Sequence, residues 1–178
     1  MRLAVFCGAH AGNGNQYTQL AQEVARSLVS RNIGIVYGGG RVGLMGVIAD
    51  TGLQAGGEVI GVIPASLASE EVAHGGVTQL HVVSSMHERK ALMADLSDGF
   101  IALPGGFGTM DEFCEILTWA QLKIHSKPVG ILNAGGYYDD LLALFDKMVR
   151  EGFVSPGNRA LVRSAPGVDE LLALVLPS

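Results

Sequence analysis

Residues 102–112, ALPGGFGTMDE, combine two features that a plain anion site does not need together. Three glycines and a threonine expose backbone N–H groups and a hydroxyl of the kind that holds a phosphate. Asp111 and Glu112 then place negative charge within a few residues of the same position. The pattern indicates a ligand with an anionic group and, close to it, a centre that gains from a carboxylate.

The glycine-rich part of this stretch predicts a phosphate loop. Gly105, Gly106 and Gly108 let backbone N–H groups converge, and Thr109 stands where a helix is expected to begin. Unpaired amides and the dipole of a helix N-terminus both favour a phosphate. The G-K-[ST] ending of a Walker loop is missing. We therefore expect phosphate binding without hydrolysis of a triphosphate.

Glu112 also has a purely structural interpretation. Residues Thr109 to Glu112 form the pattern T-x-x-E, a capping box in which the glutamate returns to the backbone amide of the threonine. A carboxylate in the first helical turn also suits the helix dipole. Local sequence alone leaves open whether Glu112 caps the helix or acts on a ligand.

A second capping pattern precedes two cations. Ser85 to Glu88 form S-x-x-E, so Glu88 is predicted to be a helix cap. Arg89 and Lys90 then lie early in that helix, where the dipole disfavours positive charge. We expect a neighbouring carboxylate or a ligand phosphate to offset this cost. For Arg89, an ordinary surface ion pair is the simplest alternative.

A second glycine loop, YGGGRVGLMG at 37–46, follows a predicted strand and opens a predicted helix. Gly38, Gly40 and Gly43 fit the dinucleotide spacing G-x-G-x-x-G. However, the loop follows the second strand, and the acid about 20 residues on, Glu58, begins a strand rather than ending one. Three interpretations stay open: contact with a mononucleotide, a tight turn without a ligand, and NAD or FAD binding.

Short β-rich runs alternate with longer amphipathic runs along the whole chain. The expected strands span 2–9, 34–39, 58–65, 80–85, 99–106 and 127–134. The expected helices span 16–31, 43–56, 86–97, 109–124, 137–151 and 167–175. The strands are nearly continuously apolar, as strands covered on both faces should be. The alternation predicts an α/β fold, a doubly wound parallel sheet with helices on both faces, in a single domain over 1–178.

Several predicted strands end in small residues, in the stretches CGA, YGGG, LPGG and LNAGG. The carboxyl ends of parallel strands share one edge of the sheet, and ligands bind there at the switch point of the strand order. The glycines are therefore expected to gather at the functional edge. The irregular segment 66–79 is a candidate flap over that edge.

Composition narrows the class of protein. The chain has 178 residues, 48% of them apolar and 16% charged, as in a well-packed soluble domain. Its net charge of -5 argues against binding to nucleic acid or to an anionic membrane. MRLAVFCGAH is too short in its apolar part for a signal peptide, and no run approaches the roughly 20 apolar residues of a membrane span. We therefore expect a cytoplasmic protein.

Cysteine and histidine usage indicates neither disulfides nor metal. Cys7 and Cys114 each lie in an apolar run, so both are predicted to be buried free thiols. The five histidines form no H-x-x-x-H pair, and none lies beside a pair of cysteines. This spacing predicts no metal site.

At these motifs the sequence resembles the LOG ("Lonely guy") family of cytokinin riboside 5′-monophosphate phosphoribohydrolases. PGGFGTMDE fits the family signature P-G-G-x-G-T-x-x-E, MHERK is similar to its M-H-x-R-K element, and YGGGRVGLMG is similar to its first glycine loop. Residues 118–142 resemble its downstream segment, so the likeness covers essentially the whole chain. The family is often labelled lysine decarboxylase, but no motif marks a pyridoxal lysine among the four lysines here, Lys90, Lys123, Lys127 and Lys147.

The resemblance implies a Rossmann-like homodimer that needs no cofactor and hydrolyses the N-glycosidic bond of adenine nucleotides to free base and ribose 5-phosphate. By motif position, the essential pair of the family falls on Arg89 and Glu112. Many members have Glu where this chain has Asp111, so we assign Asp111 no role. The substrate-binding positions that the resemblance implies are Gly39, Gly40, Glu71, Met86, Lys90, Gly105, Gly106, Phe107, Gly108, Thr109 and Thr118.

This chemistry accounts for the two features of residues 102–112. Glycosidic cleavage creates a cationic sugar carbon in the transition state, so the glycine loop would bind the phosphate and Glu112 would stabilise the cation or orient water. Arg89 would hold the geometry and charge state of Glu112, or contact substrate directly. The main alternative is a nucleotide or pterin-cofactor carrier on the same fold, but a carrier has no reason to pair Arg89 with Glu112.

Overall fold

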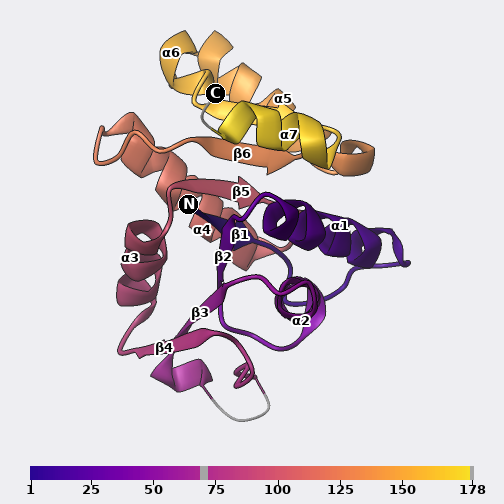
Figure 1. Cartoon of the computed structure of the whole chain (residues 1–178). Helices are drawn as coiled ribbons and strands as arrows, with labels where there is room; N and C mark the ends of the chain where they lie inside the picture. Colours follow the sequence, from indigo (N-terminus) through magenta and orange to yellow (C-terminus); the bar gives the residue numbers. More distant parts are fainter. Residues whose placement is uncertain (69–71, 177–178) are drawn as a thin grey trace.

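Seven parallel strands form one sheet in the computed structural model, which describes residues 1–68 and 72–176 (Figure 1). The strand order is β4-β3-β2-β1-β5-β6-β7. The chain winds outward from β1 to β4 and then returns to β5 on the other side of β1, so the switch point lies between β1 and β5. The strands are β1 Arg2–Phe6, β2 Gly34–Tyr37, β3 Val59–Pro64, β4 Gln79–Val83, β5 Gly99–Ala102, β6 Val129–Leu132 and β7 Val162–Ala165.

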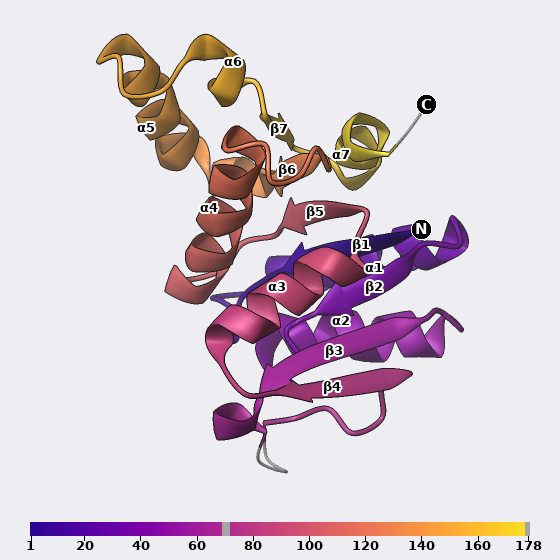
Figure 2. The ribbon, with the colours of Figure 1, turned by 90° about the vertical axis from the view of Figure 1, so that its left-hand side faces the viewer.

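Helices cover both faces of the sheet, which confirms the predicted Rossmann-like, doubly wound α/β fold. One face carries α1 Gln16–Ser30, α2 Gly43–Gln54 and α7 Val168–Val175. The other carries α3 Met86–Leu96, α4 Phe107–Gln121 and α5 Asp139–Arg150. Figure 2 shows α3 and α4 in front of the sheet and α1 and α2 behind it. The shorter helices are η1 Ala65–Leu67, η2 Ala134–Gly136 and α6 Pro156–Arg159.

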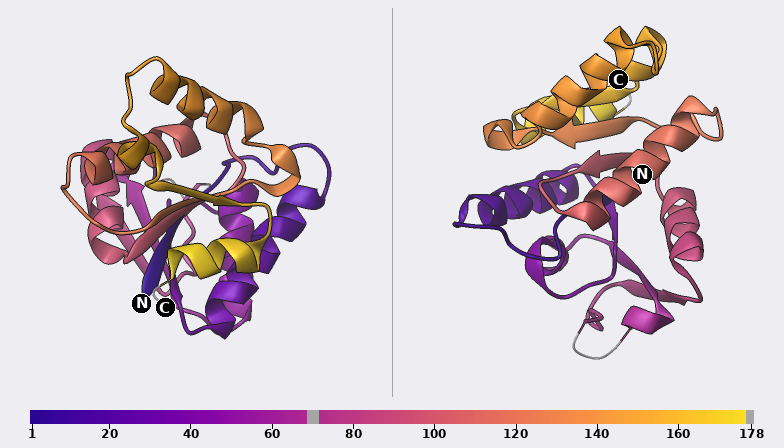
Figure 3. Two further views of the ribbon diagram at one scale, coloured as in Figure 1. Left: turned by 90° about the horizontal axis from the view of Figure 1, so that it is seen from above. Right: turned by 180° about the vertical axis from the view of Figure 1, so that it is seen from behind.

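The central strands are buried on both sides because their side chains alternate between two apolar layers. Ile35 packs with α1, α2 and α7, whereas the next residue, Val36, packs with α3, α4 and α5; both are fully buried. Figure 3 shows α1 and α7 on their common face from above, and Arg31 joins these helices through an ion pair of 2.9 Å to Asp169. No helix among the described residues is long and apolar enough to cross a membrane.

The structure departs from the sequence prediction at the sheet edges. The prediction missed β7, in which Arg163 and Ser164 are exposed, so the strand lacks a continuous apolar run. It also missed α6, a single turn capped by the Ser155 hydroxyl, which accepts a hydrogen bond of 3.1 Å from the Asn158 amide. Edge strand β4 is not covered on both faces as expected, because Val82 is 56% exposed.

The two cysteines have different environments, although both were predicted to be buried. Both are free thiols; Cys7 is buried at the end of β1, as expected. Cys114 is exposed on α4, so the prediction was wrong for this residue. Its neighbours in sequence, Phe113 and Ile116, face the core instead. The helical period of 3.6 residues turns Cys114 away from the face that these two residues bury.

Phe100, fully buried in β5, gives a direct test of the core that supports the switch point. Its ring stacks on Phe6 at a centroid distance of 6.1 Å and contacts His125 at 5.2 Å. Phe100→Ala is expected to lower the free energy of unfolding by about 3–5 kcal/mol, measured by urea denaturation. Phe153→Ala is the control: this ring is 84% exposed, so the change should be within about 0.5 kcal/mol. Equal losses for the two variants would contradict this assignment of the core.

Candidate active site

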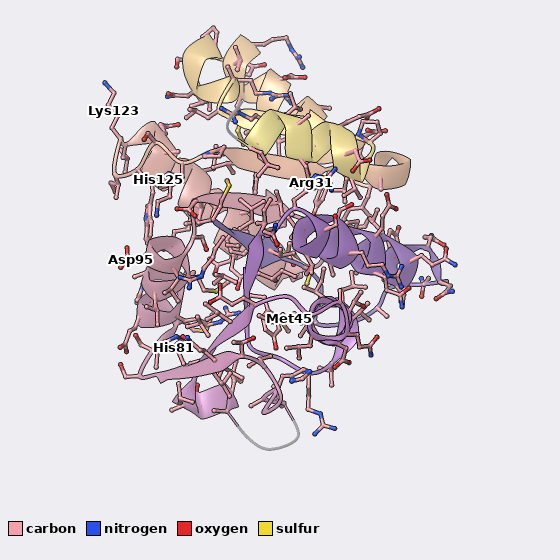
Figure 4. The ribbon with its side chains drawn as sticks, viewed as in Figure 1. Arg31, Met45, His81, Asp95, Lys123 and His125 are labelled. Atoms are coloured by element: carbon pink, nitrogen blue, oxygen red, sulfur yellow. The ribbon has the colours of Figure 1, made fainter. Side chains whose placement is uncertain are left out.

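A cavity of about 560 Å³ opens where β1, β2, β3 and β5 end, at the predicted edge of the sheet. Its walls are the loop 7–12 after β1, two residues of the glycine loop after β2, the end of β3 with η1, and the whole segment 104–109 after β5. Three helices or their approaches complete it, through Tyr17 of α1, Leu44 and Met45 of α2 and Tyr137 before α5 (Met45 is labelled in Figure 4). Glu112 and Arg89 lie in the same wall.

Arg89 and Glu112 form a buried ion pair that joins α3 to α4. Arg89 Nη1 donates to Glu112 Oε1 over 2.5 Å, and each side chain is only 10% exposed. Arg89 Nε donates to the carbonyl oxygen of Val62 at 3.0 Å, which fixes the guanidinium against the end of β3. The surface ion pair considered for Arg89 is therefore wrong. The carboxylate that was expected to offset its charge is Glu112.

The capping interpretation of Glu112 is also wrong. Helix α4 begins at Phe107, two residues earlier than predicted, and its N-cap residue is Gly106 rather than Thr109. Thr109 therefore lies inside the first turn, where it is buried. The Glu112 carboxylate pairs with Arg89 instead of returning to the Thr109 amide.

The S-x-x-E pattern at 85–88 does cap α3, but the Glu88 carboxylate binds Ser84 and not the Ser85 amide. The Ser85 hydroxyl accepts a hydrogen bond of 3.1 Å from the Glu88 amide, as the pattern predicts. The Glu88 carboxylate accepts from the amide of Ser84 at 2.8 Å and from its hydroxyl at 2.6 Å, one residue before the cap. Glu88 thus fixes the start of α3, from which Arg89 projects.

Glycine at position 38 makes room for the arginine. A Cβ atom on Gly38 would overlap Nη2 of Arg89, so the guanidinium lies directly against the backbone of the loop after β2. Any larger side chain here would displace the guanidinium from Glu112. The glycine loop therefore contributes to the site by close packing, in addition to lining the cavity.

Two acidic groups in the cavity wall, Glu112 and Cys7, have raised pKa values because they are buried. Burial raises the pKa of Glu112 above its ordinary value, and the charge and hydrogen bond of Arg89 oppose this rise. Burial also raises the pKa of the Cys7 thiol, and the negative charge of Glu112 adds to that effect. Cys7 lines the cavity, but it stays protonated at neutral pH and is not a thiolate nucleophile.

The segment after β5 has the features of an anion site. No side chain caps α4, so the N–H groups of its first turn have no partner from a cap. A Cβ atom on Gly105 would overlap the Thr109 hydroxyl and lie 2.9 Å from the amide nitrogen of Gly8. Glycine at 105 thus lets the loop after β1, the loop after β5 and Thr109 meet at one point. Partial positive charge from the helix favours a phosphate there.

Lys90 does not lie in the cavity wall. Its Nζ lies 3.1 Å from Asp111 Oδ2 and 2.9 Å from Glu115 Oε2, and its side chain is only 11% exposed. These contacts add to the Arg89 pair as links between α3 and α4. The carboxylates expected to offset the charge of Lys90 are present on α4, and Asp111, which had no assigned role, is one of them.

Of the residues predicted to bind substrate, the structure brings six to the cavity wall. They are Gly40, Gly105, Gly106, Phe107, Gly108 and Thr109, joined there by the predicted catalytic pair. Phe107 is 97% exposed at the rim. Met86 and Thr118 are exposed and, with Gly39 and Lys90, lie outside the wall. Glu71 falls outside the described residues. The substrate contacts of all these residues stay predictions.

The glycine loop after β2 is held by the candidate flap. The Arg41 amide donates to the Val72 carbonyl at 2.8 Å, and the His74 amide donates to the Gly39 carbonyl at 2.9 Å. Leu67 and Val72 from the same segment line the cavity. Glu58 lies at the opposite edge of the sheet, paired with Arg2 at 2.7 Å. Glu58, the acid at the spacing of a dinucleotide site, is therefore not at this edge.

Sequence reasoning missed two parts of the cavity. The loop after β1, which includes Gly8 and His10, was noted only as a strand end with small residues. Tyr17 and Tyr137, whose rings meet edge to face at 5.8 Å, were given no role; Tyr137 lies in the segment 118–142 that resembles the family. The strand-end signal CGA would have found the first, since it marks the carboxyl end of the central strand.

If the Arg89–Glu112 pair is broken by removing Arg89, the stability of the protein is expected to depend on pH. Without Arg89, the pKa of buried Glu112 rises further above its ordinary value of 4.5. When a carboxyl group has a higher pKa in the folded state than in the unfolded state, the folded protein loses stability as the pH rises above the pKa of the unfolded state. Arg89→Met should therefore lower the free energy of unfolding by about 3–5 kcal/mol at pH 7, with partial recovery at pH 5, in urea titrations at both pH values.

The control for this experiment is the double variant Arg89→Met/Glu112→Gln. It loses the same contact to Val62 but has no carboxylate at position 112, so its stability should vary much less between pH 5 and pH 7. Identical pH profiles for the single and double variants would contradict the role assigned to Glu112.

One family model and several known proteins match most of this chain. The family model described as "Possible lysine decarboxylase" matches residues 45–175. The chain is 55% identical over 171 residues to the "Probable cytokinin riboside 5′-monophosphate phosphoribohydrolase LOGL1" of Oryza sativa subsp. japonica, covering 96% of this chain and 77% of the relative. It is 53% identical over 171 residues to an Arabidopsis thaliana cytokinin riboside 5′-monophosphate phosphoribohydrolase, covering 96% and 80%.

Among solved structures, the chain is similar to the molybdenum cofactor binding protein from the phototrophic bacterium Rippkaea orientalis, with a TM-score of 0.73 over 98% of this chain and 94% of that one. The identity is only 19%, so this likeness shows the fold alone. The sequence relatives and the family model cover most of the chain at much higher similarity. The chain therefore belongs to the LOG family of phosphoribohydrolases, which the family model describes as possible lysine decarboxylases.

Proposed function

We propose that this protein hydrolyses the N-glycosidic bond of adenosine 5′-monophosphates, including N6-modified ones, and releases free base and ribose 5-phosphate. The observation that carries the proposal is the buried carboxylate of Glu112 beside an uncapped, glycine-rich helix start in one cavity. The names of the sequence relatives support the same reaction.

The phosphate of the substrate would bind the segment from Gly105 to Thr109. The Thr109 hydroxyl and the Gly8 amide nitrogen both lie close to Gly105, and the first turn of α4 has no side-chain cap. The helix dipole favours an anion at this position. Binding of the phosphate would bring the ribose toward Glu112, which lies one helical turn after Thr109. Gly105, Gly106, Phe107, Gly108 and Thr109 are thus proposed as phosphate contacts.

Glu112 would act on the carbon that becomes cationic. When the bond from the anomeric carbon to the base nitrogen breaks, its electron pair stays with the base and the sugar carbon gains positive charge. A carboxylate at this position stabilises the transition state more than the ground state, which raises kcat. Water then supplies the oxygen that bonds to the carbon and, in the overall reaction, the proton that the departing base takes up. Glu112 would orient this water.

Arg89 would keep Glu112 ionised and correctly oriented. Burial favours the protonated carboxyl, and the guanidinium opposes this through its charge and its hydrogen bond of 2.5 Å. The guanidinium is itself fixed by the Val62 carbonyl. A guanidinium is a poor proton donor, so Arg89 is not proposed as the acid that protonates the departing base.

The rest of the cavity suits an apolar base substituent. Leu44, Met45 and Ile63 line it, with Leu67 and Val72 from the segment around η1. These side chains would gain from burying an alkyl or alkenyl group on N6 of adenine. We therefore propose that N6-prenylated nucleotides are preferred over AMP.

A decarboxylase activity has no support in the site. None of the four lysines, all of them described, lines the cavity. Lys90 is engaged by two carboxylates, and Lys127 Nζ donates to the Ala94 carbonyl at 2.7 Å. A Schiff-base lysine must instead face its cofactor with a free amine.

We further propose a cytoplasmic homodimer. Family membership supports the dimer, and large apolar side chains on α3 and α4 remain exposed in the single chain, with Met86 41% and Leu122 62% exposed. Free thiols at both cysteines agree with a reducing compartment. Sedimentation velocity should give a single species of twice the chain mass of 18.6 kDa; a monomer at micromolar concentration would contradict the dimer.

The direct test is incubation with AMP and with N6-isopentenyl-AMP while free base is followed by chromatography. Each substrate should release one molecule of ribose 5-phosphate for every molecule of free base. The prenylated nucleotide should have the higher kcat/KM. If neither substrate releases base but nucleotide binds tightly in calorimetry, the protein is a carrier and the proposal fails.

Glu112→Gln should separate chemistry from binding. Loss of the charge is expected to lower kcat about 10²–10³-fold, as for removal of other transition-state electrostatic contacts, with KM changed less than about threefold. Asp111→Asn is the matched control, since it removes the same charge from the adjacent, 58% exposed side chain. Equal effects of the two substitutions would contradict a catalytic role for Glu112.

A further inference from the structure

We propose that Tyr137 and Tyr138 are positioning residues that hold the phosphate-binding segment after β5 in its binding conformation. The proposal rests on the proposed function, because that function makes this segment a phosphate site. The two tyrosines lie some 30 residues beyond it, between η2 and α5, and the mechanism above does not use them.

Both hydroxyl groups donate to carbonyl oxygens of this segment. Tyr138 Oη donates to the Leu103 carbonyl at 2.6 Å, and Tyr137 Oη donates to the Gly105 carbonyl at 2.7 Å. The carbonyl between them, that of Pro104, accepts from the Gly8 amide at 3.2 Å. Three consecutive carbonyls are thus each fixed by a donor from another part of the chain.

Fixing two of these carbonyls, those of Pro104 and Gly105, also fixes the N–H groups of Gly105 and Gly106. The Leu103 carbonyl shares its peptide with Pro104, which has no N–H, so its bond to Tyr138 fixes the backbone that leads into the segment. A trans peptide is planar, with its C=O and N–H pointing in opposite directions. The bond to the Gly105 carbonyl therefore sets the direction of the Gly106 N–H, at the N-cap position of α4. Glycines supply no side-chain packing to restrain this peptide, so the tyrosine hydroxyl replaces it as the restraint.

The tyrosines are themselves held rigidly. The Asn133 side chain accepts from the Tyr138 amide at 2.7 Å and donates to Asp139 at 2.7 Å, which closes the turn from β6 to α5. Gly135 and Gly136 take positive φ angles of 61° and 73° within this turn. The rings of the two tyrosines meet edge to face with centroids 4.8 Å apart.

Because the two hydroxyl groups differ in burial, their removal is expected to have different effects. Tyr138 is only 3% exposed, so removal of its hydroxyl leaves the Leu103 carbonyl without its donor in the interior. Tyr137 is 44% exposed and lines the cavity, so water can replace its hydroxyl. Tyr138→Phe should mainly destabilise the fold, whereas Tyr137→Phe should mainly loosen the phosphate segment.

The test compares Tyr137→Phe with Tyr37→Phe. The hydroxyl of Tyr37 is buried in the core without a hydrogen-bond partner among the described residues, and Tyr37 does not line the cavity. This control therefore removes the same atom without removing a restraint. Two readouts apply to both variants: hydrogen exchange of the amides at 105–109, and the Kd for ribose 5-phosphate by calorimetry, with adenine as the ligand that lacks a phosphate.

Tyr137→Phe is expected to speed hydrogen exchange at 105–109 and to raise the Kd for ribose 5-phosphate about 3–10-fold, the factor of one neutral hydrogen bond. Its Kd for adenine should stay at the wild-type value. Hydrogen exchange at 105–109 in Tyr37→Phe should also match the wild type. Unchanged exchange at 105–109 in Tyr137→Phe would overturn the proposal, whichever nucleotide the protein hydrolyses. Equal increases in the Kd for both ligands would also overturn it, since they would indicate general loosening. Failure of the proposed function appears separately, as absence of base release by the wild-type protein.

Discussion

The structure depends on a buried ion pair between two helices that follow different strands. Removing a guanidinium and a carboxylate from water has a free-energy cost that their mutual attraction often does not recover, so the Arg89–Glu112 pair is a poor source of stability. Apolar side chains of similar size would hold α3 and α4 together at least as well. The proposed function accounts for its presence, since that chemistry needs a charged carboxylate in the cavity.

Several elements of the fold are arranged so that Arg89 and Glu112 can meet. Arg89 reaches Glu112 across the ends of β3 and β2, and it can do so because position 38 has no side chain and the Val62 carbonyl accepts its Nε–H. Lys90 and its two carboxylate partners fix the same helices relative to each other outside the cavity. The geometry of one hydrogen bond is therefore controlled by two strands, two helices and a glycine loop.

The sequence predicted what depends on local pattern and missed what depends on distant contacts. The strand–helix alternation gave the doubly wound sheet, and the two glycine loops were expected at its carboxyl edge. The pattern T-x-x-E could not reveal whether Glu112 is a cap, because that depends on where α4 starts and on α3 packing beside it. Strand β7 was missed because an edge strand needs few apolar residues. Tyr137 lies in the segment that resembles the family, but its role could not be read from local pattern, since its partner lies 32 residues away.

The cavity wall draws on residues from position 7 to position 137, contributed from both sides of the switch point. Neither half of the sheet contains the whole cavity wall, so the proposed nucleotide affinity would arise only when both halves have assembled. A bound nucleotide would in turn hold the halves together and raise the stability of the whole molecule by mass action. Substrate concentration inside the cell would thereby influence how long each copy of this protein survives proteolysis.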